Sequence, residues 1–75
     1  MSTRLPAVTA AQLRRALARA GWIETRQRGS HIRLERGDAK ITVADHGGSV
    51  IVPRGTLGAL LKEAGMTADD LRALL

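Results

Sequence analysis

The chain has no cysteine, no phenylalanine and no tyrosine, and its single aromatic residue is Trp22. Without cysteine there is no disulfide framework and no thiolate site, which fits a reducing compartment. Domains that hold single strands by stacking bases usually need several aromatic side chains. A base-stacking platform is therefore disfavoured, and Trp22 is expected in the core or at its edge.

Long apolar segments are also missing. No run reaches the length of a membrane span, and residues 1–20 lack the apolar segment of a signal peptide. We therefore expect a cytoplasmic protein without a membrane partner. The 75 residues allow one domain, residues 1–75, with a thin core near the lower limit for independent folding. A partner that adds to its stability fits this size.

Positive charge is what the chain has in excess. It carries 12 Lys+Arg against 7 Asp+Glu, a formal net charge of +5. The balance is +6 over residues 1–40 and −1 over the remainder. Most of the cations are arginines, whose planar guanidinium matches phosphate. This distribution favours a polyanionic partner such as nucleic acid, although solubility is the simpler explanation of charge alone.

Three helices are expected. The first begins after a capping box of Thr9 and Gln12, continues as an apolar stripe of period 3.6, and ends at Gly21. A second apolar stripe predicts a helix from about residue 54 to residue 65. A second capping pattern predicts a short third helix over residues 68–75.

Between the first two helices, three short runs alternate with period two, as half-buried strands do. They are residues 23–28, 31–35 and 40–43. Gly29-Ser30 is typical of a two-residue hairpin loop, because glycine takes positive φ at its first position. Gly37-Asp38 marks a second turn within residues 36–39. The pattern predicts a three-stranded antiparallel sheet.

These turns fix a register in which directly opposed residues share a face. Glu24 is then expected opposite Glu35, and Thr25 opposite Leu34. The expected apolar face collects Ile23, Ile32, Leu34, Ile41 and Val43. The other face collects Arg26, Arg28, His31, Arg33, Lys40 and Thr42. The fold class is α+β, in the order α-β-β-β-α with a short C-terminal helix. Its helices cover the apolar face and leave the arginine face open.

His31 is the sharpest candidate for chemistry, because it is expected on the cationic face opposite Arg28. RNA cleavage needs a base for the 2′-hydroxyl and an acid for the leaving oxygen. It also needs cations on the phosphorane oxygens, which Arg28, Arg26 or Arg33 supply. The alternative is a solvated strand histidine, and the spacing alone slightly favours that alternative.

His46 follows Asp45 just beyond the third strand, and the register sets His31 opposite Ala44. His46 is thus a candidate second acid–base group or phosphate contact, with a polar loop residue as the simpler alternative. Metal sites usually need three or four protein ligands. The chain has no third histidine and no cysteine, so no metal and no cofactor is expected.

With these residues placed, the chain resembles the HicA family of toxins from bacterial type II toxin–antitoxin systems. The similarity runs from the first helix to the C-terminus. The residues that carry it are Gly21-Trp22, Arg26-Gln27-Arg28-Gly29-Ser30-His31, the end of the third strand through His46, and Gly55-Thr56-Leu57 with Leu60, Lys62, Ala64 and Gly65.

The resemblance implies an mRNA interferase, a small ribonuclease that halts translation, with a fold like that of double-stranded-RNA-binding domains. It implies that His31 is the catalytic residue, that no metal takes part, and that a HicB-like antitoxin covers the active surface. The expected RNA-binding residues are Arg26, Arg28, Ser30, Arg33, Lys40 and His46. Many members have Val-Pro-x-His where this chain has Val43-Ala44-Asp45-His46, so His46 is a secondary site.

Two other functions fit the same charge. A binding module would hold RNA through phosphates and cut nothing, which makes His31 incidental. A DNA-binding protein would use Arg14, Arg15 and Arg19 of the first helix in a major groove. The remaining sequence shows no helix-turn-helix pattern, so this function ranks last.

Overall fold

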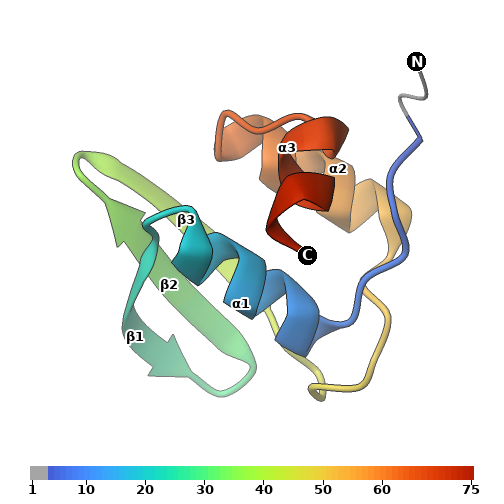
Figure 1. Ribbon diagram of the computed structural model, residues 1–75. Helices are drawn as coiled ribbons and strands as arrows, with labels where there is room; N and C mark the ends of the chain where they lie inside the picture. The colour runs from blue at the N-terminus through green and yellow to red at the C-terminus, as the bar shows by residue number, and fades with distance from the viewer. Residues whose placement is uncertain (1–3) are drawn as a thin grey trace.

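A computed structural model describes residues 4–75. The expected α+β architecture is confirmed (Figure 1). The elements are α1 (Ala10–Arg19), β1 (Ile23–Arg28), β2 (His31–Arg36), β3 (Ala39–Ala44), α2 (Arg54–Glu63) and α3 (Ala68–Leu74).

The helix starts follow the capping signals. The Thr9 hydroxyl accepts from the backbone N–H of Gln12 at 3.1 Å, and the Gln12 side chain accepts from the N–H of Thr9 at 2.9 Å. Thr67 and Asp70 form the same capping box at the start of α3. Both boxes satisfy N–H groups that have no partner inside the helix. α2 instead begins after Pro53, without a side-chain cap.

The sheet is antiparallel in the order β1-β2-β3. Gly29 and Gly37 take φ of 59° and 58° in the two hairpin loops, as their positions predicted. Leu34 lies opposite Ile41, and Ile32 lies opposite Val43, so the predicted pairing of the second and third strands is confirmed. All four of these side chains are buried.

The first strand departs from the predicted register near its start. The pairing shifts between Glu24 and Arg26, and Glu24 lies opposite Leu34. The predictions that Glu24 faces Glu35 and that Thr25 faces Leu34 are therefore wrong. The physical reason is a β-bulge, in which two residues of one strand oppose a single residue of its partner.

The bulge reverses the faces of the residues that precede it. Ile23 lies opposite Glu35 and is 67% exposed, so the prediction that it joins the apolar face is wrong. Glu24 turns toward the helices, where it binds Arg14 of α1. The hydroxyl of Thr25 donates to the Glu35 carboxylate at 2.7 Å. The bulge thus replaces a hydrophobic contact with an ion pair.

Ile23→Thr tests this register. Because Ile23 lies outside the core, its replacement should change the free energy of unfolding by about 0.5 kcal/mol or less. Ile32→Thr, the matched change at a fully buried position, should be clearly destabilising, since it removes packing and buries a hydroxyl. Urea denaturation of both variants measures the difference. An equal loss in both variants would contradict the bulged register.

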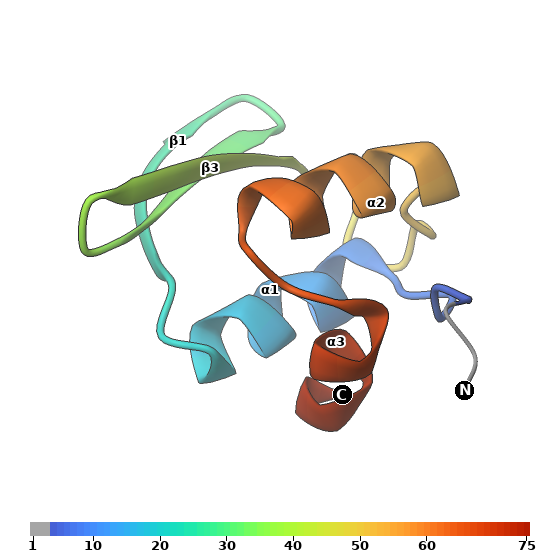
Figure 2. The same cartoon turned by 90° about the horizontal axis from the view of Figure 1, so that it is seen from above.

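All three helices lie on one side of the sheet (Figure 2). The core forms between that side and the helices, as the apolar face predicted. Trp22 is 2% exposed and belongs to this core, and the Arg36 guanidinium lies 4.9 Å from the centre of its ring. The buried hydrophobic residues are Val8, Ala10, Leu13, Ala16, Leu17, Trp22, Ile32, Leu34, Ile41, Val43, Val52, Leu57, Leu60, Leu61, Ala64 and Leu71.

The loop after β3 is fastened to the start of α1. The N–H of Val52 donates to the carbonyl of Val8 at 2.9 Å, and the N–H of Ala10 donates to the carbonyl of Val50 at 3.0 Å. The second bond gives a partner to one of the unpaired N–H groups at the start of the helix. The segment that carries His46 is therefore held by backbone bonds at its far end.

Candidate nucleic-acid interface

The sheet face turned away from the helices, called the open face below, carries a shallow pocket of about 180 Å³. The pocket joins side chains from all three strands. Arg28 lies opposite His31, and Arg26 lies opposite Arg33. The part of the sheet next to the Gly29-Ser30 loop therefore presents three guanidinium groups and an imidazole. The lining residues are Arg26, Arg28, His31, Arg33 and Thr42, and all five are exposed.

No ion pair in the described part of the chain neutralises the charge of this pocket. None of the ion pairs among residues 4–75 involves Arg26, Arg28 or Arg33. Like charges directly opposite on neighbouring strands repel one another, and Arg26 faces Arg33 in this way. A bound polyanion would relieve that repulsion. The open face therefore has the electrostatics of a phosphate-binding surface.

An ion-pair network that the sequence did not predict joins α1 to β1 and to the loop after β3. Arg14 of α1 donates from Nε and Nη2 to both carboxylate oxygens of Glu24, at 2.8 and 2.7 Å. Its Nη1 donates to Oδ2 of Asp45 at 2.9 Å, and the N–H of Gly47 donates to Oδ1 at 2.9 Å. One arginine thus ties α1 to the bulge of β1 and to the loop that follows β3.

The same loop is tied to the first hairpin. The N–H of Asp45 donates to the carbonyl of Ser30 at 2.7 Å, so the residues before His31 and before His46 are bonded to each other. The only sequence signal for the network was that Arg14 lies off the apolar stripe of its helix. Its partners are 10 and 31 residues away, and the bulge that brings Glu24 within reach has no signature in the pattern.

In a comparison with protein-family models, residues 10–66 match the HicA toxin of bacterial toxin–antitoxin systems. The chain belongs to the HicA toxin family. It is therefore the toxin of a toxin–antitoxin system, and an antitoxin is its partner. The matched range holds α1, all three strands and α2, and thus the whole pocket of the open face. No curated protein matches the chain.

Three predicted RNA-binding residues of this HicA-family toxin lie outside the pocket. Ser30 is half-buried and uses its carbonyl to hold Asp45. Lys40 lies on the open face opposite Glu35, near the loop that joins β2 and β3. His46 lines a separate pocket of about 110 Å³ beside α2. Their contacts with RNA stay predictions.

Hydrogen bonding keeps the network of this HicA toxin ionised. The guanidinium of Arg14 holds the pKa of Glu24 below its ordinary value. The pKa of Asp45 is also lowered, first by the Gly47 N–H and then by Arg14. Both carboxylates raise the pKa of Arg14 in return. Both carboxylate oxygens of Asp45 accept hydrogen bonds in this network. Residues 4–75 hold no cluster of three or more His, Asp or Glu side chains that could bind a metal ion.

The network predicts a pH-dependent contribution to stability. Because the pKa values of both carboxylates are lowered on folding, their contribution is complete above the unfolded-state values and is lost as pH falls through the folded-state values. Arg14→Met should therefore lower the Tm at pH 7, and the difference from wild type should shrink below about pH 4. Thermal denaturation at pH 7 and pH 3 measures it. Arg15→Met, on the exposed side of the same helix, is the control. An equal difference at both pH values would contradict the network.

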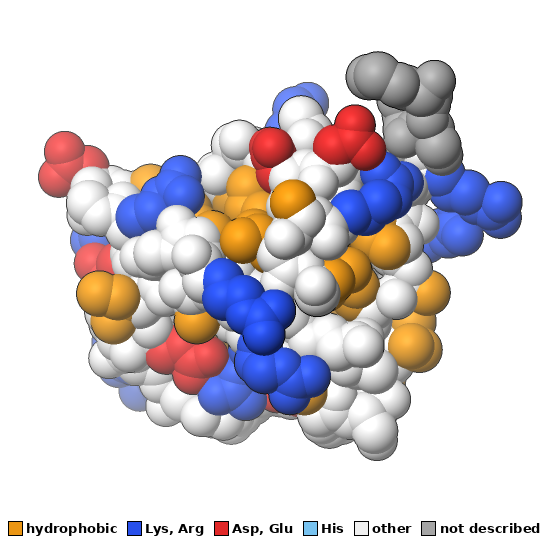
Figure 3. All heavy atoms as spheres, viewed as in Figure 1, with side chains coloured by type: hydrophobic (Ala, Val, Ile, Leu, Met, Phe, Trp, Pro, Cys, Tyr) orange, Lys and Arg blue, Asp and Glu red, His pale blue; other side chains and the backbone are white. Residues whose placement is uncertain are grey.

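Basic side chains also cross the helix side of the toxin (Figure 3). Two of the three arginines of α1 form bonds with other parts of the same chain. Arg14 binds two carboxylates, and Arg19 donates to the carbonyl of Leu74 at 2.6 Å. Arginines that hold α1 to the sheet and to α3 are poorly available for a DNA groove. No helix within residues 4–75 has the length and apolarity that crossing a membrane requires.

Proposed function

We propose that this HicA-family toxin is an mRNA-cleaving endoribonuclease in which His31 is the catalytic residue and no metal takes part. The observation that carries the proposal is the pocket of the open face, where His31 is exposed among three arginines that form no ion pair within residues 4–75. Free imidazole and free guanidinium groups at one site are what phosphoryl transfer to a 2′-hydroxyl requires. The toxin would act on mRNA in the cytoplasm.

The proposed reaction is an in-line displacement within the RNA. A base removes the proton of the 2′-hydroxyl, the 2′-oxygen bonds to the adjacent phosphorus, and the bond from phosphorus to the 5′-oxygen breaks. A proton then goes to that 5′-oxygen, which leaves as a hydroxyl. His31 moves one of these protons. Arg28, directly opposite, together with Arg26 and Arg33, stabilises the charge on the phosphorane oxygens.

Lys40, Ser30 and His46 extend the RNA contacts in this proposal. Lys40 is near the start of β3, and His46 lies two residues beyond its end. A strand of six residues spans about 20 Å, so basic or polar groups are available over a path of that length beside the reaction centre. Ser30 adds a hydroxyl at the hairpin next to His31.

The proposal also includes inhibition by the antitoxin. A HicB-like protein would inhibit the toxin by covering the open face, which is the surface that the helices leave bare. An acidic antitoxin surface would relieve the same arginine repulsion that RNA relieves. The complex would then exclude RNA by direct competition for these arginines.

Cleavage of a mixed-sequence RNA in the presence of a chelator tests the function. Wild type should cut the RNA, and His31→Ala, matched by circular dichroism, should not. Equal cutting by both proteins would remove His31 from the reaction. Binding of RNA by wild type without any cleavage products would identify a binding module.

A further inference from the structure

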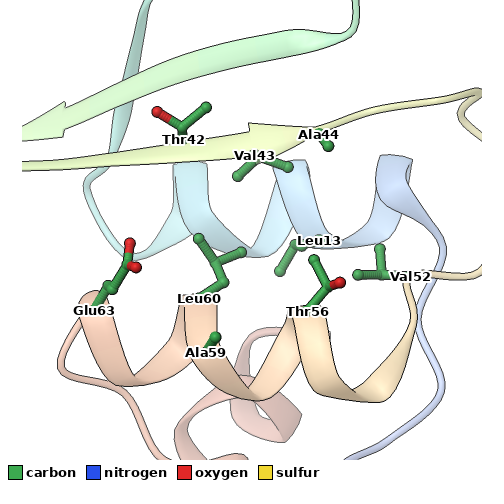
Figure 4. A pocket seen from close by; sticks show the side chains of 9 residues that line it. All are labelled: Leu13, Thr42, Val43, Ala44, Val52, Thr56, Ala59, Leu60 and Glu63. Atoms are coloured by element: carbon green, nitrogen blue, oxygen red, sulfur yellow. The ribbon is translucent and has the colours of Figure 1, made fainter.

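A slot opens beside the outer edge of β3, between this strand and α2 (Figure 4). Its volume is about 190 Å³. The inner wall is apolar and includes the buried side chains of Leu13, Val43 and Leu60. The rim is more polar, with Thr56 and Glu63 reaching up from α2 toward the strand. We call this cavity the β3–α2 slot.

The strand at the rim has unused backbone groups. Within residues 4–75 β3 pairs only with β2. Arg36 and Ala39 flank the two-residue loop that joins these strands. Alternation along an antiparallel pair then turns the N–H and C=O groups of Thr42 and Ala44 outward. No backbone bond from a loop or another element within residues 4–75 reaches these two residues. The slot therefore has hydrogen-bond donors and acceptors along one rim.

The slot adjoins the pocket of the open face at one shared residue. Thr42 lies opposite Arg33 and lines both cavities. Neighbouring strands are about 4.8 Å apart, so the slot begins one strand beyond the arginines of β2. On its other side the slot shares Ala44, Val52 and Thr56 with the small pocket that His46 lines.

The chemistry of the slot selects its occupant. About 190 Å³ is less than the roughly 300–1,000 Å³ of sites for drug-sized ligands, which suits one flat ring system. A nucleobase has apolar faces and a polar edge, as the slot has apolar walls and a polar rim. The chain has no phenylalanine or tyrosine, and its one tryptophan, Trp22, is buried, so the open face has no large aromatic ring on which a base could stack.

We propose that the β3–α2 slot binds one nucleobase of the single-stranded RNA whose phosphates lie on the open face. The inference rests on the proposed function for the phosphate contacts and adds a site of base recognition. Proteins read single-stranded RNA mainly by hydrogen-bonding the edges of splayed bases. The rim of β3 and the Glu63 carboxylate are placed to do this. A carboxylate only accepts hydrogen bonds, so it favours the amino group of A, C or G, which offers two N–H donors. Uracil offers a single N3–H, which lies between two carbonyl oxygens that repel the carboxylate.

Binding of 2′-O-methyl decamers tests the proposal, because they lack the 2′-hydroxyl and cannot be cleaved by the proposed reaction. Four fluorescent decamers are compared, one of uridine only and three with a single central A, C or G. Wild type should bind at least one amino-bearing decamer about five- to hundredfold more tightly than the uridine decamer. Anisotropy titrations measure the four affinities.

Ala59→Leu enlarges an exposed helical side chain at the slot without touching the core. It should reduce the base preference to about twofold and leave binding of the uridine decamer nearly unchanged. Glu63→Gln should also weaken the preference, because it replaces an acceptor-only group with an amide. Ala73→Leu, an equal change on the exposed surface of α3, should keep the full preference.

The outcomes separate this inference from the function on which it rests. If wild type binds none of the four decamers, the proposed RNA-binding function of the open face is wrong. Equal binding of all four, or an unchanged preference in Ala59→Leu, overturns the slot alone. If Ala59→Leu keeps the preference but weakens the complex with the antitoxin, the slot is a protein-binding site, and the proposal is likewise overturned.

Discussion

Replacing His31 with alanine should slow RNA cleavage by about 10²–10⁴-fold, the usual contribution of a positioned acid–base group. The fold should be unaffected, because the His31 side chain is exposed and makes no hydrogen bond to another group within residues 4–75. The three arginines remain, so RNA affinity should change much less than the rate. Initial rates of cleavage at saturating RNA, with chelator present, measure the effect.

His46→Ala is the matched control for this result. His46 is also exposed, but it lines a different pocket, beside α2. Its loss should therefore reduce the rate less than the loss of His31. Equal losses in the two variants would show that both histidines act on the proton transfers. A full rate in His31→Ala, with normal thermal stability, would assign the chemistry to another residue.

Removing the arginines of the open face together should weaken RNA binding about a hundredfold near 0.1 M salt. Each phosphate contact with a single strand contributes a slope of about −0.7 to log K against log salt concentration. The triple variant of Arg26, Arg28 and Arg33 to alanine loses three contacts, so its slope should be smaller by about 2. If wild type and the triple variant have equal RNA affinity at about 1 M salt, their affinities differ by about two logarithmic units at 0.1 M.

A second triple variant separates local contacts from net charge. Arg15, Arg54 and Lys62 are exposed and lie away from the pocket of the open face. Changing them to alanine also removes three of the charges behind the net +5, but it should leave most of the RNA affinity. Equal weakening by both triple variants would mean that binding follows total charge. The variant of the open face should also unfold no more easily than wild type, since Arg26 no longer repels Arg33.

The sequence by itself determined the elements and most of the sheet. Capping boxes and hairpin glycines act through contacts a few residues apart, so Thr9 with Gln12 and Gly29 with Ser30 could be interpreted locally. Apolar stripes pack on distant elements, but their period is visible along the chain itself. Period two and the turns then placed Ile32 and Leu34 inside, and His31 and Arg33 outside. The cationic face follows from those two signals alone.

Only the tertiary structure decided the bulge of β1 and what depends on it. The side-chain pattern of β1 permits both a regular and a bulged backbone pairing with β2. The ion pair of Glu24 with Arg14 forms in the bulged pairing, which the structure adopts. Asp45 reaches the same arginine across 31 residues of chain. The β3–α2 slot likewise depends on how α2 lies against the free edge of β3. Single polar contacts such as these leave no periodic trace in the sequence, because each involves one residue from each element.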